Sequence, residues 1–460
     1  MTDGRSSLPV LAVRGLIMFL IAMLFAVTPS WVADIPNSPV QAQGEFDPSE
    51  IWNLAEIQDP TTLNAEVVAG PTRGVTAGVE MNVIQVKFNS IDRGAGPIHI
   101  HGFVAIPTGH ASGMLPAVVY GHGAGDQADE DVARTLAARL SAVTISFSGP
   151  GQGLSTGAPS TWQNWLNTIP DIRNSWLYQY VYSAMRAVTY LATLPEVNRQ
   201  RIGMTGISAG GLMTLIANGV DDRLAAAYPI MATGDWRRSL EAGSWFFAFP
   251  LGETGFTPDS PEVLAFERNL DPIHYAGRQH APVMLINGAQ DEFFPITTTR
   301  STYEALRAPE KRLEVIYDWD HGYYANSSRQ YDTYNNTLNA AKRIFGDAEA
   351  WFKWHLADSE PVPPIPQVSL TQRDGKAIFT VAPEHARGAK AIRLFYSRDR
   401  AYTFDRNQMT RRFDGSYSTS LPGDMTDLVY FVEVEWPRSL YLSSIPGMPD
   451  GFVPRVRPPQ

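Results

Sequence analysis

The chain has 460 residues, 44% of them hydrophobic and 18% charged, which is a globular composition and more than one hydrophobic core usually holds, so we expect two domains. The formal net charge of −10 argues against a nucleic-acid partner and against binding to an anionic membrane surface. The sequence contains no cysteine, which excludes thiol catalysis, cysteine metal ligands and disulfide bonds.

The N-terminal segment has the pattern of an export signal. Arginines precede a continuously apolar run at residues 15–27. This run is shorter than the roughly 20 residues that a membrane-spanning helix needs. We therefore expect a signal and processing region at 1–42, cleaved after Ala33 or Ala42. The sequence predicts a secreted or periplasmic protein with no stable membrane span after cleavage; the alternative is a protein anchored in the membrane by residues 15–27.

Two strands are predicted at 82–88 and 98–106, because apolar and polar residues alternate there on either side of a glycine-containing turn. His99 and His101 share one face of the second strand. Two imidazoles at this spacing can share a metal ion, but the sequence places no third ligand near them. We expect a plain polar strand face here, with no metal and no cofactor.

A strand-like run at 115–120 leads into the loop Gly-His-Gly-Ala-Gly-Asp at 121–126. Backbone N–H groups in such a loop can stabilise a developing negative charge, as in an oxyanion hole. We expect the N–H of Ala124 to be one donor, with that of Gly123 as the alternative. A phosphate-binding loop would continue with Gly-Lys and Ser or Thr, which this sequence lacks.

Ser208 lies in the sequence Gly-Ile-Ser-Ala-Gly-Gly at 206–211, between an apolar run and a helix-like run. A serine at a sharp strand-to-helix turn needs neighbours without side chains two residues before and after it, and Gly206 and Gly210 meet this need. Such a turn exposes the hydroxyl and directs the first N–H groups of the helix toward the attacked atom. We therefore expect a nucleophilic Ser208 and an oxyanion donor at Ala209; a glycine-rich turn without catalysis is the alternative.

Two later strand-like runs end near residues that complete the chemistry of Ser208. The run at 281–288 is followed by Asp291, and the run at 313–317 by His321. The C-terminal ends of parallel strands line one crevice, so the three side chains can meet there. A serine hydroxyl needs a neutral imidazole to accept its proton, and the imidazole needs a carboxylate to orient it. We expect Asp291 to be that carboxylate. Other acidic residues of the same loops are the alternatives: Glu292, Asp318 and Asp320.

A resemblance to a known superfamily rests on four motifs, at 120–125, 206–211, 288–295 and 318–322. They resemble the α/β-hydrolase superfamily, and within it the dienelactone hydrolases, the acetyl xylan esterases and the catalytic domain of prolyl oligopeptidase-like enzymes. The chain order Ser, Asp, His is the order of that superfamily. The resemblance covers residues 90–357 and implies Ser208 as nucleophile, His321 as base and Asp291 as acid. We expect the α/β-hydrolase domain to extend over residues 43–357.

Residues 236–271 lie where enzymes of this superfamily often insert a cap, and they fit neither a regular helix nor a regular strand. We expect Trp245, Phe246 and Phe247 to bind substrate as an apolar wall for an acyl or aryl group. The alternative is an ordinary buried aromatic cluster.

The hydrolase-like region contains a predicted helix at about 174–193 and closes with another at 331–356. A proline-rich linker follows at 358–366, which neither a helix nor a sheet tolerates. Short strands separated by turns through 367–460 predict an immunoglobulin-like β-sandwich. The predicted fold is thus an α/β-hydrolase domain with a mostly parallel, doubly wound sheet, followed by a small C-terminal β-sandwich.

The function that these expectations predict is an exported serine hydrolase that cleaves carboxylic esters through an acyl-enzyme. A serine peptidase of the prolyl oligopeptidase-like type is the first alternative, although such enzymes usually carry a β-propeller that the residues before the first strands are too few to form. A non-catalytic binding protein on a hydrolase scaffold is the second. The expected partner is a small or polymeric ester; the sequence does not specify the acyl group, the alcohol or the oligomeric state.

Overall fold

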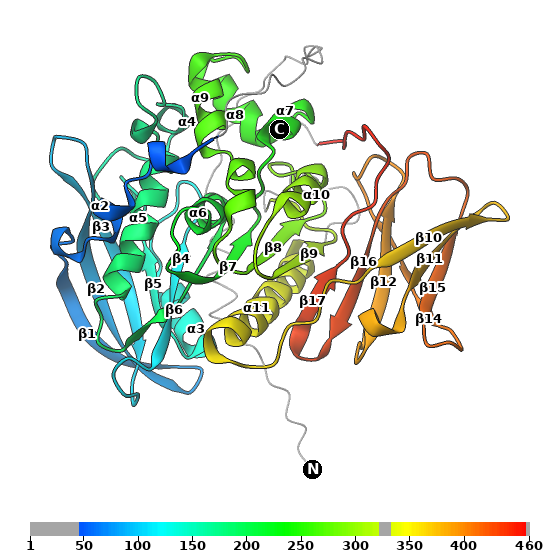
Figure 1. Cartoon of the computed structure of the whole chain (residues 1–460), viewed down its shortest axis with the longest axis horizontal. Coiled ribbons are helices and arrows are strands. Elements are labelled where there is room, and N and C mark those ends of the chain that lie inside the picture. Colours follow the sequence, from blue (N-terminus) through cyan, green and yellow to red (C-terminus); the bar gives the residue numbers. More distant parts are fainter. Residues whose placement is uncertain (1–45, 322–332, 457–460) are drawn as a thin grey trace.

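The computed structural model describes residues 46–321 and 333–456. The predicted export signal at 1–42 lies outside the described residues. A large part with a central sheet and helices is followed by a smaller part made of β-strands, which lies against one end of the large sheet (Figure 1). The prediction of an α/β-hydrolase fold followed by a C-terminal β-sandwich is confirmed.

The described residues of the large part form a nine-stranded sheet in the order β1-β2-β3-β5-β4-β6-β7-β8-β9. The pairs among β1, β2, β3 and β5 are antiparallel, and the remaining pairs, from β5 through β4 to β9, are parallel. Helices cover both faces of the parallel strands, so these strands are almost continuously apolar. The strands are β1 Glu66–Thr76, β2 Val79–Asp92, β3 Pro97–Pro107, β4 Leu115–Gly121, β5 Val143–Phe147, β6 Val197–Ile207, β7 Leu224–Ile230, β8 Val283–Gly288 and β9 Lys311–Ile316.

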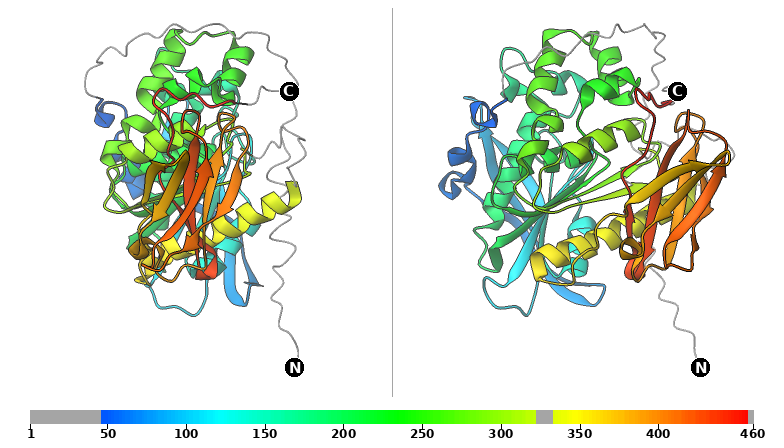
Figure 2. Two further views of the ribbon diagram at one scale, coloured as in Figure 1. Left: turned by 90° about the vertical axis from the view of Figure 1, so that its right-hand side faces the viewer. Right: turned by 45° about the vertical axis from the view of Figure 1, so that its right-hand side comes forward.

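Two layers of helices enclose this sheet (Figure 2). The helices α3 (Glu130–Leu140) and α11 (Thr333–Ala357) contact each other and cover one face. The helices α5 (Trp176–Leu191) and α6 (Ala209–Asn218) contact each other and cover the opposite face. The side chains of α5 are buried along its whole length, because α2 (Leu54–Gln58), α4 (Trp162–Trp165) and η3 (Ile172–Asn174) also pack against it.

The segment 236–271, which the sequence assigned to no regular structure, forms three helices that gather at one end of the sheet (Figure 1). The aromatic stretch lies in α8, which is apolar all round and contains Pro250, so it lacks the periodicity that reveals a surface helix. The remaining helical elements are η1 Pro48–Glu50, α2 Leu54–Gln58, η2 Pro60–Thr62, α4 Trp162–Trp165, η3 Ile172–Asn174, α7 Trp236–Glu241, α8 Trp245–Thr254, α9 Pro261–Leu270, η4 Pro272–His274, η5 Ala276–Arg278 and α10 Ile296–Ala305.

The β-sandwich consists of two antiparallel sheets, with the strand orders β10-β11-β15-β14 and β13-β12-β16-β17. In β11 buried residues alternate with more exposed ones, as expected for a strand with one covered face. In β16 nearly every residue is buried, because its second face lies toward the hydrolase domain. The elements are β10 Val368–Arg373, β11 Lys376–Val381, η6 Pro383–Ala386, β12 Ala391–Ser397, β13 Asp405–Gln408, β14 Thr410–Arg411, β15 Tyr417–Pro422, β16 Val429–Trp436, η7 Pro437–Ser439 and β17 Leu440–Ser443.

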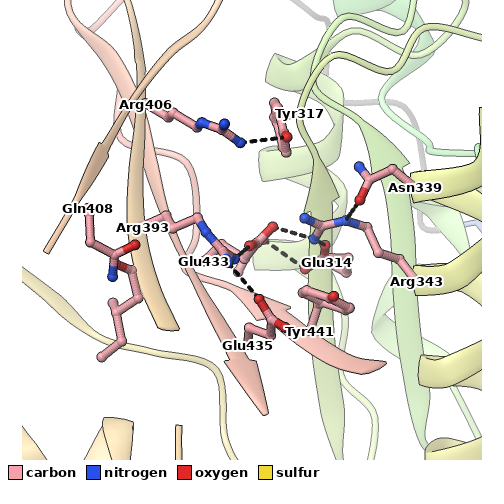
Figure 3. Close-up of polar contacts among 12 residues, drawn as sticks. Glu314, Tyr317, Asn339, Arg343, Arg393, Arg406, Gln408, Glu433, Glu435 and Tyr441 are labelled. Atoms are coloured by element: carbon pink, nitrogen blue, oxygen red, sulfur yellow. Dashed lines mark hydrogen bonds and ion pairs between the residues drawn. The ribbon is translucent and has the colours of Figure 1, made fainter. Parts of the chain in front are cut away.

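A buried network of charges joins the two domains (Figure 3). Arg343 of α11 donates to Glu314 of β9 at 2.7 Å and is ion-paired with Glu433 of β16. The guanidinium also lies 4.0 Å from the ring centre of Tyr441. Burial raises the pKa of Glu314 to about 8, although the charge of Arg343 opposes this shift. These charged groups lose their hydration where the two domains meet. They stabilise the interface only if the charges lie close together and are well oriented.

The free edge of β9 is also covered by the sandwich. The N–H of Val315 donates to the hydroxyl of Ser443 on β17 at 3.0 Å, and that hydroxyl donates to Glu314 at 3.0 Å. A side chain of the second domain therefore takes the place that a neighbouring strand would occupy at this edge.

We expect the substitution Arg343→Met to lower the free energy of unfolding by about 3–5 kcal/mol, because it removes the arginine that pairs with buried Glu314 and one of the two arginines that pair with buried Glu433. Denaturant unfolding at neutral pH measures this loss. Arg300→Met is the matched control, because Arg300 forms an exposed pair with Glu304 and its loss should cost about 0.5 kcal/mol or less. Equal losses in the two variants would show that the interdomain network contributes no more than a surface pair.

Candidate active site

Ser208 lies at the turn from β6 into α6, with φ 56° and ψ −114°. A non-glycine residue seldom adopts this backbone conformation, and such strain is common at active sites. The turn brings the backbone very close to the end of β4. A Cβ atom on Gly210 would lie 2.2 Å from the carbonyl oxygen of Gly121, and one on Gly206 would lie 2.6 Å from the same oxygen. Both positions therefore require glycine.

The structure brings Ser208, Asp291 and His321 together, although they follow three different strands. The Nε2 atom of His321 lies 2.8 Å from Oγ of Ser208. The Nδ1 atom lies 3.0 Å and 2.9 Å from the two carboxylate oxygens of Asp291. With its proton on Nδ1, a neutral imidazole in this position presents an unprotonated Nε2 to the serine hydroxyl. The arrangement can accept the proton of Ser208 and stabilise the imidazolium that forms.

The other acidic residues named as alternatives occupy different positions. Glu292 is buried, and its Oε2 accepts a hydrogen bond from the backbone N–H of His321 at 2.9 Å. Asp320 is buried in the loop of His321, and Asp318 in the same loop has a positive φ of 50°. The described hydrogen bonds to the imidazole ring come from Ser208 and Asp291.

The predicted oxyanion donors lie on two segments beside the serine. Ala209 is the first residue of α6, so its N–H faces the N-terminal end of the helix. The loop after β4 runs next to the serine, since a Cβ atom on Gly123 would lie 3.8 Å from Cβ of Ser208. Within residues 46–321 and 333–456, neither the N–H of Ala209 nor that of Ala124 donates to a protein acceptor. Both remain candidates for binding an oxyanion.

His122 holds the loop that carries Ala124, a role that the sequence analysis missed. Its Nδ1 donates to the carbonyl of Gly123 at 2.6 Å, and its Nε2 accepts the N–H of Gly149 at 2.8 Å. Complete burial lowers the pKa of this histidine to about 4, so the ring is neutral, as both hydrogen bonds require. In the sequence, the position of His122 between two glycines of this loop is the feature that could have indicated this role.

The predicted substrate wall is buried. Trp245, Phe246 and Phe247 are only 3%, 3% and 2% exposed. Phe246 lies in the middle of an aromatic cluster, which corresponds to the alternative of a core cluster rather than to an open wall. The rings nearest to it include those of Trp162, Trp165, Trp236, Phe247, Phe266 and Phe294.

Two aromatic rings that the sequence analysis did not single out contact His321. Phe293 stacks on its imidazole with the ring centres 4.4 Å apart, and Phe294 lies against it at 5.5 Å. Trp245 makes an edge contact with Phe293, with the ring centres 6.0 Å apart. In the sequence, the position of Phe293 directly after Asp291 and Glu292 is the feature that could have indicated this contact. Through Phe293, the helix α8 is in contact with the active site.

His99 and His101 form a polar strand face. The Nδ1 atom of His99 lies 2.9 Å from the side-chain oxygen of Asn89, and burial lowers the pKa of His101. Across the described ranges, no group of three or more His, Asp and Glu side chains is arranged to hold a metal ion. Nor does any described helix have the length and apolar character needed to cross a membrane.

Known proteins match part of this chain. Residues 163–348 match the sequence model of the prolyl oligopeptidase family. The acetyl esterase Axe7A of Xylanibacter ruminicola is 28% identical over 147 residues, which cover 31% of this chain and 33% of the esterase. The uncharacterized peptidase YuxL of Bacillus subtilis is 25% identical over 165 residues, 35% of this chain and 23% of that protein. The aligned regions thus span a third or less of these two relatives.

An acetyl xylan esterase from Paenibacillus sp. R4 has a similar fold, with a TM-score of 0.50, 23% sequence identity and coverage of 58% of this chain and 86% of the other. The fold and the arrangement of Ser208, Asp291 and His321 define a hydrolase-type site at the C-terminal ends of parallel strands. The chain has the α/β-hydrolase fold, and it is similar to acetyl xylan esterases and to the prolyl oligopeptidase family, in keeping with the resemblance of its sequence motifs.

We expect Gly210→Ala to destabilise the protein and to disturb the turn of Ser208, because the added methyl group would overlap the backbone of Gly121. Gly252→Ala is the matched control: a Cβ atom at Gly252 in α8 meets no atom within 4 Å. Thermal unfolding and far-ultraviolet circular dichroism should show a lower Tm for the first variant and an equal or higher Tm for the second. Equal Tm values would contradict the close contact at the turn.

Proposed function

We propose that this protein is a serine esterase that cleaves carboxylic esters through an acyl-enzyme on Ser208. The observation that carries the proposal is the continuous hydrogen-bonded line from Ser208 through His321 to Asp291. A serine alone is a poor nucleophile, and this line supplies both a base and a group that orients the base. The strained turn and the adjacent N–H groups of Ala209 and Ala124 complete what acyl transfer needs.

In the first half of the reaction, Oγ of Ser208 attacks the carbonyl carbon of the ester while its proton passes to Nε2 of His321. The N–H groups of Ala209 and Ala124 stabilise the oxyanion of the tetrahedral intermediate. The bond to the alcohol oxygen then breaks, and His321 gives its proton to the leaving alcohol. Asp291 remains ionised throughout and offsets the charge of the imidazolium.

In the second half, water attacks the carbonyl carbon of the acyl-enzyme, and His321 accepts a proton from that water. The bond between the acyl carbon and Oγ of Ser208 breaks, and the proton returns to Oγ. A carboxylic acid is released. The cycle uses no group beyond these side chains and the two N–H donors.

Two observations favour an ester over a peptide as substrate. The aligned relatives include an acetyl esterase, and the imidazole is flanked by the aromatic rings of Phe293 and Phe294, which suit a small apolar acyl group. The leaving group of an ester is an alcohol, which needs less help from a general acid than the amine that leaves from an amide. A peptidase with the same residues is the second candidate, because residues 163–348 match a peptidase family and YuxL carries the name of a peptidase.

The proposal includes export to the periplasm or the outside of the cell, supported by the apolar run at residues 15–27. N-terminal sequencing of the protein recovered from cells of its source is the test. A new N-terminus after Ala33 or Ala42 is expected, and an intact Met1 would favour an uncleaved membrane anchor instead.

We expect Ser208→Ala to remove nearly all esterase activity while the protein stays folded, because only the hydroxyl that forms the covalent bond is lost. Asp291→Asn should lower kcat by about 10³- to 10⁴-fold, because an amide favours the wrong imidazole tautomer. Hydrolysis of p-nitrophenyl acetate and labelling by a fluorophosphonate measure both effects. Asp318→Asn serves as the control for charge removal near the site, and a larger loss in that variant than in Asp291→Asn would move the acid to Asp318.

We expect short p-nitrophenyl esters, acetate to butyrate, to be hydrolysed far faster than aminoacyl or prolyl anilides. The measurement compares kcat/KM for both classes, together with acetylated sugars and aromatic ester fragments, on one preparation of enzyme. The Ser208→Ala protein gives the background rate for each compound. Anilide turnover equal to or above ester turnover would replace the esterase with the peptidase.

A further inference from the structure

His321 is held by three consecutive residues of the loop after β8, each through a different part of the histidine. Asp291 accepts from Nδ1 of the ring, and Phe293 stacks on the ring face at 4.4 Å between centres. Glu292 lies between them in sequence, and its carboxyl oxygen Oε2 accepts the backbone N–H of His321 at 2.9 Å. The ring, its face and its backbone are thus all fixed by one short stretch of chain.

Glu292 also connects this stretch to the cap. Its backbone carbonyl accepts the N–H of Trp245, the first residue of α8, at 2.9 Å. Its side chain is buried, with the residue only 2% exposed, and the second carboxyl oxygen, Oε1, accepts no hydrogen bond from the described part of the chain. Burying a carboxyl group with so few hydrogen-bond partners lowers the stability of the fold, which points to a functional role for Glu292.

We propose that Glu292 is a positioning residue for the reaction: its carboxyl oxygen fixes the backbone of His321 so that the ring meets Ser208 and Asp291 at the same time. The inference rests on the proposed function of these three residues. His321 lies in the loop after β9, outside the described helices and strands. The hydrogen bond from its N–H to Glu292 ties its backbone to the loop of Asp291, and a displacement of the ring by about 1 Å is enough to reduce catalysis strongly.

Burial and the neighbouring acidic residues favour the neutral form of the Glu292 carboxyl group. Burial raises its pKa well above the usual value, and the negative charges of Asp320 and Asp291 raise it further. Together with His321, these are the titratable groups that face it from the described residues. A neutral carboxyl at this position adds no second negative charge beside Asp291. As the pH rises through the raised pKa, ionisation introduces repulsion from both neighbours and costs stability and positioning.

Two substitutions separate the hydrogen bond from the bulk of the side chain. Glu292→Gln keeps the shape and an oxygen that accepts the N–H of His321, and it resembles the neutral acid. Glu292→Met keeps the length but removes the acceptor. Activity on p-nitrophenyl acetate is expressed per serine that reacts with a fluorophosphonate, so that misfolded protein is not counted, and pH profiles are recorded for all variants.

We expect Glu292→Met to lower kcat by about tenfold to a hundredfold with little change in KM, because the base is misplaced while the substrate site is intact. Glu292→Gln should restore most of the wild-type kcat and follow the wild-type profile at neutral pH. As the pH rises and Glu292 ionises, the wild-type rate should fall relative to that of Glu292→Gln.

Each result bears on the proposal. A normal kcat per reactive serine in Glu292→Met, or an equally large loss in Glu292→Gln, would overturn the positioning role. A fall in rate with rising pH that persists unchanged in Glu292→Gln would show that ionisation of Glu292 does not cause it. That result would overturn the inference that Glu292 acts in its neutral form. If Ser208 of the wild-type protein does not react with the fluorophosphonate, the proposed function itself fails, independently of any variant at Glu292.

Discussion

The close backbone contact between the turn of Ser208 and the end of β4 is the constraint on which the rest of the site depends. Gly210 lies so near to Gly121 that no side chain fits between them. This contact sets the distance between the serine and the loop that carries Ala124. Because the loop is also tied to Gly149, just after β5, through His122, the serine and the N–H groups of Ala209 and Ala124, which we propose as oxyanion donors, form one connected unit. Rigid donors need no reorganisation as charge develops, which is how such sites stabilise an oxyanion.

The acid and histidine loops form a second unit, which is joined to the first by the hydrogen bond between Ser208 and His321. This unit is supported from two sides. Trp245 of the cap bonds to the backbone of Glu292, and Gln290, next to the acid, donates to the carbonyl of Tyr402 in the sandwich at 3.0 Å. The C-terminal domain therefore contacts the loop of Asp291 as well as the sheet, and a change in its position would be felt near the active site.

The fold class and the residues of the serine, acid and histidine loops were predictable, because each follows an apolar strand and the glycines mark the turn. The parallel sheet then brings these loops to one edge. The roles of His122, Glu292 and Phe293 were not predictable, since each depends on a contact between loops that are distant in sequence. The helix α8 was missed for another reason: it is apolar on all sides, so burial erased the periodic pattern by which helices are recognised.

The bond between Val315 and Ser443 has a consequence for how copies of the protein behave toward one another. A long parallel sheet with an open edge is a template on which another chain can add a strand. At β9 this edge is closed, because the sandwich lies over it and Ser443 takes up the N–H of Val315. At the opposite edge, β1 is exposed but broken by bulges near Ala69, and Pro71 has no N–H to offer. Neither border of the sheet therefore favours edge-to-edge aggregation, and at one border this protection is supplied by the second domain.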